Sequence, residues 1–369
     1  MRKIKVLHIV HDFLNGGIES FLYYLSQQQI NNSKLEVEIL CLQKQGKVTN
    51  KRISESSVKC HYISIQAKDL SINRYFQILK LSNTYDIIHF HTFKPLLSFF
   101  LHFTKAQKVI TVHSAGDISR PASFQFKLKN KFFEIVLNKS MNLIAHNSYY
   151  TKNYWKNRGV TGKNNFVVYN GVPNVNKHNV ENVLEVYPDL ENEFIIGTTS
   201  RFIPWKRVEL LVNAFSKTAN RRKMKLLLVG DGPEKEKIEK LIKSKNLDTQ
   251  VIMTGFRSNV TDYQAVMDVC VFPSVSEPFG LVAIECLLLG KPVFVMQDGG
   301  GITELIKDIE PHNIAKSESH LVDLMDTSYL NRRVITLNAN NRVKAGQNYS
   351  VANTEKQYFD LYKQLIGNS

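Results

Sequence analysis

Cysteine is scarce in this sequence, which argues against a disulfide framework or a structural zinc site. The 369 residues contain four cysteines at scattered positions, Cys41, Cys60, Cys270 and Cys286. Such usage is typical of a reducing compartment. Long apolar runs are also missing. No apolar run reaches the length of about 18 residues that suggests a membrane span. The apolar run at 4–10 is too short for a secretion signal. We therefore expect a cytoplasmic protein.

The length predicts two domains, because 369 residues exceed what one ordinary core holds. The net charge of +15 lies entirely in the first half. Residues 1–175 contain 24 Lys and Arg against 9 Asp and Glu, whereas residues 176–369 contain 24 of each. A positive field of this kind attracts nucleic acid, anionic lipid or an acidic substrate, and charge alone does not choose among them.

Strand and helix patterns alternate through both halves, which predicts an α/β fold with two parallel sheets covered by helices on both faces. We expect domains at 1–173 and 174–350, joined by a polar linker at 173–192. The last helix, about 351–369, is a candidate to pack back on the first domain. Predicted strands are 4–10, 37–42, 59–65, 86–91, 108–113, 142–147, 166–169, 194–200, 226–230, 251–256, 268–273 and 292–296.

Two glutamates flank a predicted helix start in the second half. Glu277 precedes Pro278 and is pushed towards extended backbone, while helical periodicity starts near Gly280 and carries Glu285. The backbone N–H groups at this helix start, from Phe279 to Leu281, form a favourable anion site. N–H donors for phosphate and carboxylates for hydroxyls suit a nucleotide sugar. The alternative is that both glutamates are surface charges beside a helix cap.

Three features of the first half lie where a ligand could bind. A glycine turn, Gly16-Gly17, follows the first strand, although the third glycine of a dinucleotide fingerprint is absent and a plain tight turn is the alternative. His113 ends a predicted strand at the edge where parallel sheets bind ligands. His89 and His91 are better explained as structural histidines whose hydrogen bonds are satisfied within the protein.

A basic helix with an apolar stripe is predicted within residues 120–139. Its lysines include Lys127, Lys129 and Lys131. One interpretation is a helix that covers the sheet and has a solvated face. The other, which the charge of the first half favours, is a surface that lies on anionic lipid, where each lysine adds about 1 kcal/mol.

Together these motifs resemble the retaining glycosyltransferases of family 4, which have the GT-B fold of two Rossmann-like domains facing a central cleft. The resemblance covers nearly the whole chain, and its specific part is the glutamate, seven residues, glutamate signature from Glu277 to Glu285. Trp205 before Lys206 is a departure from the usual pattern. The other matching segments are Asn15-Gly16-Gly17 with Glu19, Thr111-Val112-His113, Asn170-Gly171-Val172, Thr199-Ser200-Arg201 with Lys206, and 228–233.

The resemblance implies a role for each matching residue. Arg201 and Lys206 would hold the diphosphate of the donor, and Gly16-Gly17 would offer backbone N–H groups to the same phosphates. Glu285 would bind the ribose hydroxyls, and His113 would lie beside the sugar. Glu277, with the amides of Phe279, Gly280 and Leu281, would grip the transferred sugar and its phosphate.

The reaction implied is sugar transfer with retention, through a front-face step in which the leaving phosphate helps to take the acceptor's proton. No metal is needed in the family, and an Asp-x-Asp element is absent here. We expect a UDP-sugar donor and a saccharide or lipid-linked acceptor in surface polysaccharide synthesis. The enzyme would work at the inner face of the cell membrane and bind no nucleic acid.

Three alternatives to transfer stay open at this point. One is another enzyme on the same fold, a nucleotide-sugar epimerase or a phosphorylase. Another is a non-catalytic protein that binds anionic lipid or nucleic acid through the basic half. The third is a nicotinamide enzyme, which the missing third glycine disfavours.

Overall fold

The structure, a computed structural model, describes residues 2–13, 16–44, 56–65, 71–92, 94–115, 124–162, 164–174 and 178–367. The chain divides into two compact units. The first unit comprises residues 1–173 together with 350–369, and the second comprises 174–349. The last helix, α16 (Val351–Gly367), is part of the first unit and contacts its helix α1 (Gly17–Ile30).

The first unit is built on a parallel sheet with the order β3-β2-β1-β4-β5-β6-β7. The strand order reverses between β1 and β4, and ligands of open parallel sheets bind at such a point. The strands are β1 (Ile4–Val10), β2 (Leu35–Cys41), β3 (Lys59–Tyr62), β4 (Ile87–Phe90), β5 (Gln107–Val112), β6 (Leu143–His146) and β7 (Asn165–Val167). The remaining helices are α3 (Ile72–Ser82), α4 (Pro95–Phe100), η2 (Leu101–Phe103), α5 (Phe124–Ser140) and α6 (Tyr149–Lys156).

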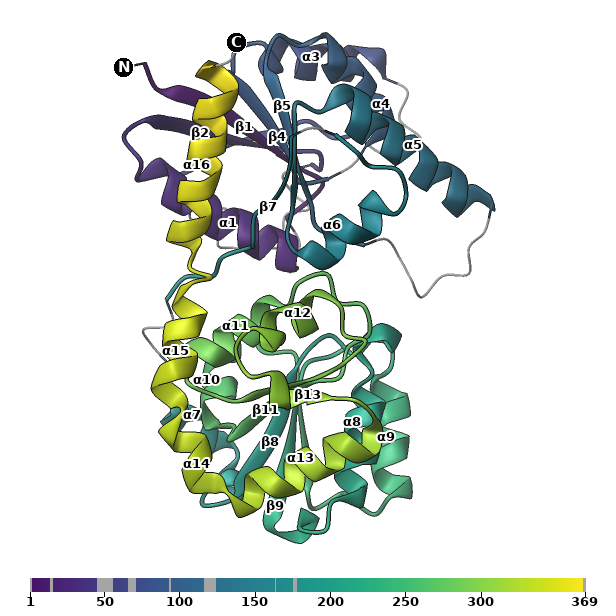
Figure 1. Cartoon of the computed structure of the whole chain (residues 1–369), viewed down its shortest axis with the longest axis vertical. Helices are drawn as coiled ribbons and strands as arrows, with labels where there is room; N and C mark the ends of the chain where they lie inside the picture. Colours follow the sequence, from purple (N-terminus) through teal and green to yellow (C-terminus); the bar gives the residue numbers. More distant parts are fainter. Residues whose placement is uncertain are drawn as a thin grey trace. The chain divides into compact units, whose positions relative to one another are not determined.

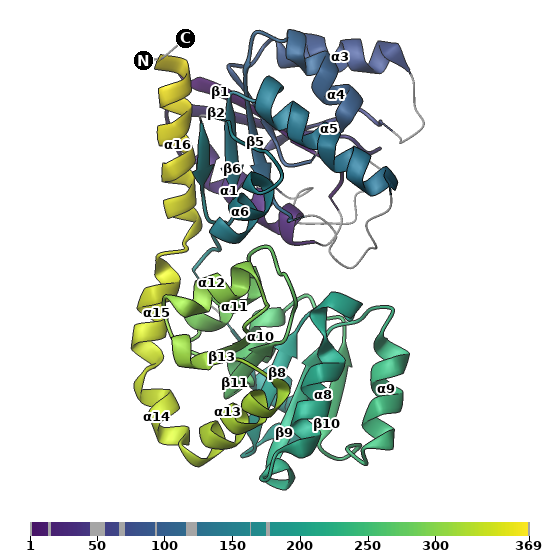
Figure 2. The ribbon, with the colours of Figure 1, turned by 45° about the vertical axis from the view of Figure 1, so that its right-hand side comes forward.

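Alternation along the strands separates the two faces of this sheet. Leu7 and Ile9 of β1 share a buried cluster with Ile78 of α3, Leu97 of α4 and Leu137 of α5. The residues between them face the other side, which α1 and α16 cover (Figure 1). The turned view in Figure 2 shows the same two layers of helices around the sheet.

The second unit repeats the plan with the strand order β10-β9-β8-β11-β12-β13, again all parallel, and the order reverses between β8 and β11. Helices α8, α9 and α13 share one core with β8 and β9 (Figure 2). Its strands are β8 (Phe194–Thr199), β9 (Met224–Val229), β10 (Val251–Gly255), β11 (Val269–Phe272), β12 (Val293–Met296) and β13 (Ile314–Ala315). Its helices are α7 (Val180–Val186), η3 (Pro188–Leu190), η4 (Pro204–Lys206), α8 (Val208–Lys217), η5 (Arg221–Lys223), α9 (Lys235–Ser244), α10 (Val260–Val266), α11 (Leu281–Leu288), α12 (Gly301–Lys307), η6 (Pro311–Asn313), α13 (Glu318–Leu330), α14 (Arg332–Leu337) and α15 (Ala339–Gln347).

The predicted α/β architecture with two parallel sheets is confirmed, but the linker predicted at 173–192 is wrong in its second part. Residues 180–190 form α7 and η3. The Asn179 side chain accepts a hydrogen bond from the Asn182 N–H at 3.1 Å, and Val183 is buried where α7 contacts α10. A seven-residue helix is too short to show clear periodicity, so tertiary packing decides it. Among the described residues, no helix is both long and apolar enough to cross a membrane.

Candidate active site

In the second unit, three loops at the carboxyl ends of its central strands are tied together by backbone hydrogen bonds. The Val275 N–H donates to the Trp205 carbonyl at 2.9 Å, which joins the loop after β11 to the loop after β8. The Glu277 N–H donates to the Gly299 carbonyl at 2.7 Å, which joins it to the loop after β12. Because the loops after β8 and β12 both hold the loop that carries Glu277, the Glu277 side chain extends from a fixed backbone.

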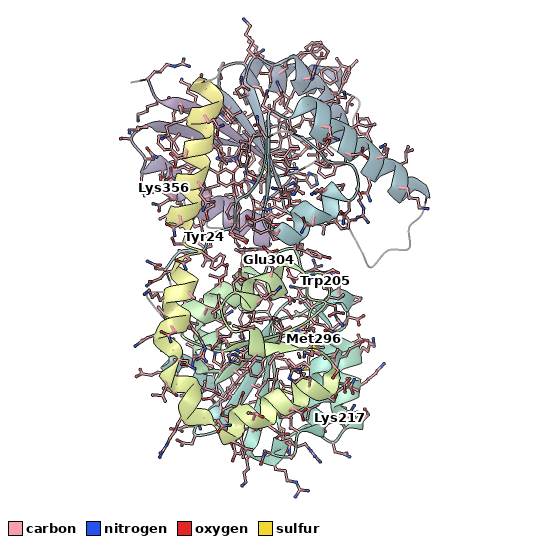
Figure 3. All side chains as sticks on the ribbon, viewed as in Figure 1. Tyr24, Trp205, Lys217, Met296, Glu304 and Lys356 are labelled. Carbon is pink, nitrogen blue, oxygen red and sulfur yellow. The ribbon has the colours of Figure 1, made fainter. Side chains whose placement is uncertain are left out.

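Lys206 and Glu277 form an ion pair at this edge. Lys206 Nζ donates to Glu277 Oε2, and both side chains are about seven-eighths covered. The same Nζ lies 4.4 Å from the centroid of the Trp205 ring, so the ring and the carboxylate hold the ammonium between them. Trp205, the departure from the usual pattern, thus has a structural role. It lies at the same end of the second unit as Glu304 of α12 (Figure 3).

Gly280 forms the N-terminal cap of α11 in a conformation that favours glycine. Its φ is +106°, and a Cβ at this position would lie 2.7 Å from Ile302 Cγ1 of α12. At Gly301 a Cβ would lie 2.1 Å from the Pro278 carbonyl oxygen. The glycines therefore allow the starts of α11 and α12 to lie against each other. Phe279 is buried beneath them, and Leu281 begins α11.

Glu285 lies in the middle of α11 and contacts a buried amide. Gln264 Nε2 of α10 lies 3.4 Å from Glu285 Oε2 and donates to Thr199 Oγ1 of β8 at 3.0 Å. Gln264 is fully buried, so it links the end of β8 to the carboxylate. Glu285 itself is half-buried.

Arg201 lies two residues after the last residue of β8 and is exposed. No acidic side chain within the described residues lies close enough to form an ion pair with it. By contrast, its neighbour Arg207 is bound to Asp298, with 2.6 Å between Nη2 and Oδ1. Among the described residues Arg201 thus has no acidic partner that competes with a ligand for its charge.

In the first unit the glycine segment lies beside the carboxyl group of Glu19. Gly16 is the N-terminal cap of α1, and the Glu19 side chain folds back over it: a Cβ on Gly16 would lie 2.2 Å from Glu19 Oε2. Burial raises the pKa of Glu19 to about 7; its own backbone N–H opposes the shift, and the neighbouring Asp12 adds to it. Asn15 lies outside the described residues, and Gly17 is exposed.

His113 follows β5 and is half-buried against Phe21 of α1, with ring centroids 5.6 Å apart. Its Nε2 lies 3.1 Å from His91 Nδ1, and burial lowers the pKa of His113 to about 3. The interpretation of His89 as a structural histidine agrees with its bonds to Tyr362 Oη at 2.6 Å and Thr111 Oγ1 at 2.7 Å. His91 is likewise bonded through both nitrogens.

The structure thus brings one set of the predicted residues together within the second unit, at the carboxyl ends of β8 and β11: Arg201, Lys206, Glu277, Phe279, Gly280, Leu281 and Glu285. The predicted residues of the first unit, Gly16, Gly17 and His113, follow β1 and β5, the two strands that flank β4. Lys127 and Lys131 are exposed on α5, and the Lys129 side chain lies outside the described residues.

Sequence reasoning missed the partners that hold these residues. His8, Gln29 and Asp12 were not selected, although His8 of β1 is hydrogen-bonded to His91, which follows β4, and His91 is bonded in turn to His113. One signal was available: His89 and His91 are two apart in a predicted strand, which places both on one face. The Lys206–Glu277 ion pair joins residues 71 apart, and no local pattern reveals it.

Two parallel-sheet units with candidate ligand-binding residues at their strand ends are the architecture of the GT-B fold. The chain is similar to the crystal structure of Anabaena Alr3699/HepE in complex with UDP and glucose, with a TM-score of 0.83. That similarity covers 98% of this chain and 100% of the other at 19% identity, which shows the fold alone.

Family models extend this conclusion from fold to family. "Glycosyltransferase Family 4" matches residues 15–174, and "Glycosyl transferases group 1" matches residues 167–346. The chain belongs to this family of glycosyltransferases, as its motifs predicted.

Two relatives illustrate the range of the family. N-acetyl-alpha-D-glucosaminyl L-malate synthase of Bacillus anthracis is 36% identical over 131 residues, 36% of this chain and 34% of that protein. The N-acetylgalactosamine-N,N'-diacetylbacillosaminyl-diphospho-undecaprenol 4-alpha-N-acetylgalactosaminyltransferase of Campylobacter jejuni is 27% identical over 249 residues, 65% of this chain and 64% of that protein. The chain thus matches about a third of the Bacillus protein's length and just under two thirds of the Campylobacter protein's.

Proposed function

We propose that the protein is a retaining glycosyltransferase that moves a sugar from a UDP-sugar to a saccharide or lipid-linked saccharide acceptor in bacterial surface polysaccharide synthesis. The observation that carries this proposal is the cluster at the ends of β8 and β11. It combines Arg201, which forms no ion pair within the described parts of the chain, with the ammonium of Lys206 and the carboxylates of Glu277 and Glu285. Two cations match a diphosphate, and the carboxylates match hydroxyl groups.

Each residue has a role in this proposal. Arg201 and Lys206 bind the diphosphate, and Glu277 binds the transferred sugar together with the start of α11. Glu285, supported by Gln264, accepts hydrogen bonds from the ribose. Charge-assisted bonds of this kind contribute about 1.5–3 kcal/mol each.

The predicted residues of the first unit also have roles in this proposal. The Gly16–Gly17 segment offers backbone N–H groups to the phosphates, and His113 lies beside the sugar. The glycosidic bond to phosphate breaks, and the acceptor oxygen attacks the anomeric carbon from the same face. The acceptor's proton passes to the departing phosphate, whose charge the protein cations stabilise without a metal.

For the acceptor we propose a lipid-linked saccharide at an anionic membrane surface. Helices α4 and α5 of the first unit are in contact, and with η2 they expose large apolar side chains beside basic ones. Phe103 is 63% exposed, Phe99 59% and Leu128 61%, and Lys127 and Lys131 extend from α5. We call these five residues the α4–α5 surface. Apolar and basic side chains together suit anionic lipid, and the Campylobacter relative is named for a diphospho-undecaprenol acceptor.

The proposed function is tested by incubating the full chain with a panel of nucleotide sugars, with and without lipid-linked saccharides, and following release of the nucleoside diphosphate. Acceptor-dependent release is expected. Conversion of the nucleotide sugar without any acceptor would instead favour an epimerase on the same fold.

A further inference from the structure

Four histidines lie together in the first unit. His8 of β1 is paired in register with His89 of β4, and their ring centroids are 5.0 Å apart. His91, two residues beyond His89, lies on the same face, with its ring centroid 5.1 Å from His8 and 5.4 Å from His113. This face lies beneath α1 and α16, and His8, His89 and His91 are buried.

Three of the four rings form one continuous chain of hydrogen bonds that begins at Gln29 of α1. His8 Nε2 lies 2.8 Å from Gln29 Oε1, and His8 Nδ1 lies 2.9 Å from His91 Nε2. His91 Nδ1 lies 3.1 Å from His113 Nε2. His89 is outside the chain, because both of its nitrogens are bonded to hydroxyl groups of Thr111 and Tyr362.

The rings of the chain are neutral at physiological pH. Burial lowers the pKa of His8 to about 4 and that of His113 to about 3, and it lowers the pKa of His91 well below its ordinary value. A neutral imidazole carries one N–H donor and one acceptor nitrogen. Each ring in the chain therefore donates once and accepts once, and all three must do so in the same direction.

The Gln29 side chain lies with its amide oxygen towards His8 Nε2, and its amide nitrogen has no hydrogen-bond partner among the described residues. This orientation sets the direction, because an amide oxygen only accepts. His8 must donate from Nε2, so its Nδ1 accepts from His91 Nε2. His91 Nδ1 then accepts from His113 Nε2. This leaves His113 Nδ1 without a proton, and that atom is buried and has no hydrogen-bond partner among the described residues. A buried acceptor without a partner is uncommon and suggests a missing donor.

We infer that Gln29 is a positioning residue that acts through His8 and His91 to fix His113 as the Nε2–H tautomer, with its Nδ1 presented to a hydroxyl of the transferred sugar. The hydroxyl as ligand rests on the proposed function, whereas the tautomer rests on the hydrogen-bond chain alone. Gln29 lies three turns into α1 and does not itself contact the nucleotide sugar.

A metal bound by His8, His89 and His91 is a poorer explanation of the cluster. Their ligand atoms lie within 4.8 Å of one another. Two nitrogens bound to one tetrahedral zinc would be about 3.3 Å apart, but His8 Nδ1 and His91 Nε2 are at the 2.9 Å of a shared proton. Every nitrogen of the three rings already has a partner within the protein.

The tautomer is tested directly by proton–nitrogen correlation NMR of the full chain labelled with 15N-histidine, with the His113 signals assigned from a His113→Asn variant. A protonated Nε2 and an unprotonated Nδ1 at His113 are expected at neutral pH. A protonated Nδ1 at His113, or a change of these signals on adding zinc at one equivalent, overturns the inference.

Three variants test the role of Gln29. Gln29→Met removes the acceptor at similar volume, so His113 should show both tautomers and turnover of the nucleotide sugar should fall about three- to tenfold. Affinity for UDP alone, which lacks the sugar, should not change. Gln29→Glu, which keeps an acceptor oxygen, should restore much of the turnover, and Gln28→Met, at the half-buried position before it, is the matched control.

The possible outcomes separate the tautomer from the function. If Gln29→Met mixes the tautomers but leaves turnover at the wild-type level, the sugar hydroxyl is not the ligand of Nδ1, and that part of the inference fails. If His113 keeps one tautomer in Gln29→Met, Gln29 does not set the direction, and the inference fails although the proposed function stands. If the wild-type protein transfers no sugar, the proposed function fails, and the hydroxyl ligand with it.

Discussion

Lys206 Nζ donates a hydrogen bond to Glu277 Oε2, and this ion pair connects the loop after β8 to the loop after β11. Because both side chains are mostly covered, each charge depends on the other. A diphosphate that approaches Lys206 therefore meets a cation that is already oriented, and a sugar that approaches Glu277 meets a carboxylate that is already held. The pair serves binding and local stability together.

A double-mutant cycle measures that coupling. We expect Lys206→Met and Glu277→Gln to be non-additive in the free energy of unfolding by about 1–3 kcal/mol, because each single change leaves one covered charge without its partner. Urea unfolding of the two single variants and the double variant gives the value. The exposed pair Lys217–Glu318 of the same unit is the matched control and should couple by less than about 1 kcal/mol. Equal coupling in both pairs would contradict this account.

Arg201→Ala is expected to separate binding from stability. Arg201 is exposed and forms no ion pair within the described chain, so its loss should change the free energy of unfolding by no more than about 0.5 kcal/mol. Its affinity for UDP should fall about tenfold or more, because a charge-assisted bond to phosphate is lost. Isothermal titration calorimetry measures the affinity, and Arg222→Ala, at another exposed arginine of this unit, should leave it unchanged. UDP affinity that survives the loss of Arg201 counts against its role.

Glu19 should make stability fall as pH rises. Its pKa in the folded protein is about 7, raised from 4.5, chiefly by burial. Below pH 4.5 the carboxyl is protonated whether the chain is folded or not, and the favourable contribution of the folded carboxylic acid is lost progressively up to about pH 7. After allowance for the partial exposure of Glu19, the free energy of unfolding should fall by about 1–2 kcal/mol over this pH range.

Glu19→Gln removes this dependence. The variant should gain about 1–2 kcal/mol on the wild type between pH 4 and pH 8, as measured by urea unfolding at both values. Glu239→Gln, at an exposed position of α9, controls for a general change of charge. A constant difference between Glu19→Gln and the wild type across this range would show that Glu19 does not titrate as described.

The α4–α5 surface should bind anionic vesicles. Replacing Phe99 and Phe103 by Ser should weaken binding to phosphatidylglycerol vesicles about tenfold or more, because two exposed aromatic side chains no longer enter the lipid. Phe256→Ser, at a position 63% exposed in the second unit, is the apolar control.

The basic side chains of the same surface give a second test in the vesicle assay. Exchanging Lys127 and Lys131 for Gln should weaken binding at low salt and reduce its salt dependence, whereas Lys240→Gln on α9 should have little effect. Unchanged vesicle binding by the lysine variant would contradict a role for α5.

Most strands and helices could be predicted from hydrophobic periodicity and from turn residues. Strands such as Leu226–Val229 are fully buried apolar runs, which is what a central parallel strand requires, and β8 to β12 were found near their observed bounds. Short elements held by distant partners could not be read in this way. Helix α7 depends on packing against α10, and the side chain of Asn179 caps it.

In the candidate site too, residues in local motifs could be predicted and residues that act through distant contacts could not. Glu277, Glu285, Arg201 and Lys206 could be chosen because local motifs place them at strand ends and a helix start. Their supports could not be chosen, since Gln264 reaches Glu285 from another helix and Gln29 reaches His8 across 21 residues. Contacts of this kind are products of the fold, and the sequence holds no local record of them.

The central claim is that the two cations in the loop after β8, Arg201 and Lys206, bind the diphosphate of a sugar donor during transfer. The most direct test compares acceptor-dependent UDP release from a UDP-sugar by the wild type and by Lys206→Ala, at equal concentrations of folded protein. We predict that kcat/KM falls about 10- to 150-fold in the variant, since a charge-assisted bond worth about 1.5–3 kcal/mol is lost, while Lys217→Ala keeps the wild-type value. Turnover by Lys206→Ala at the wild-type rate would contradict the account.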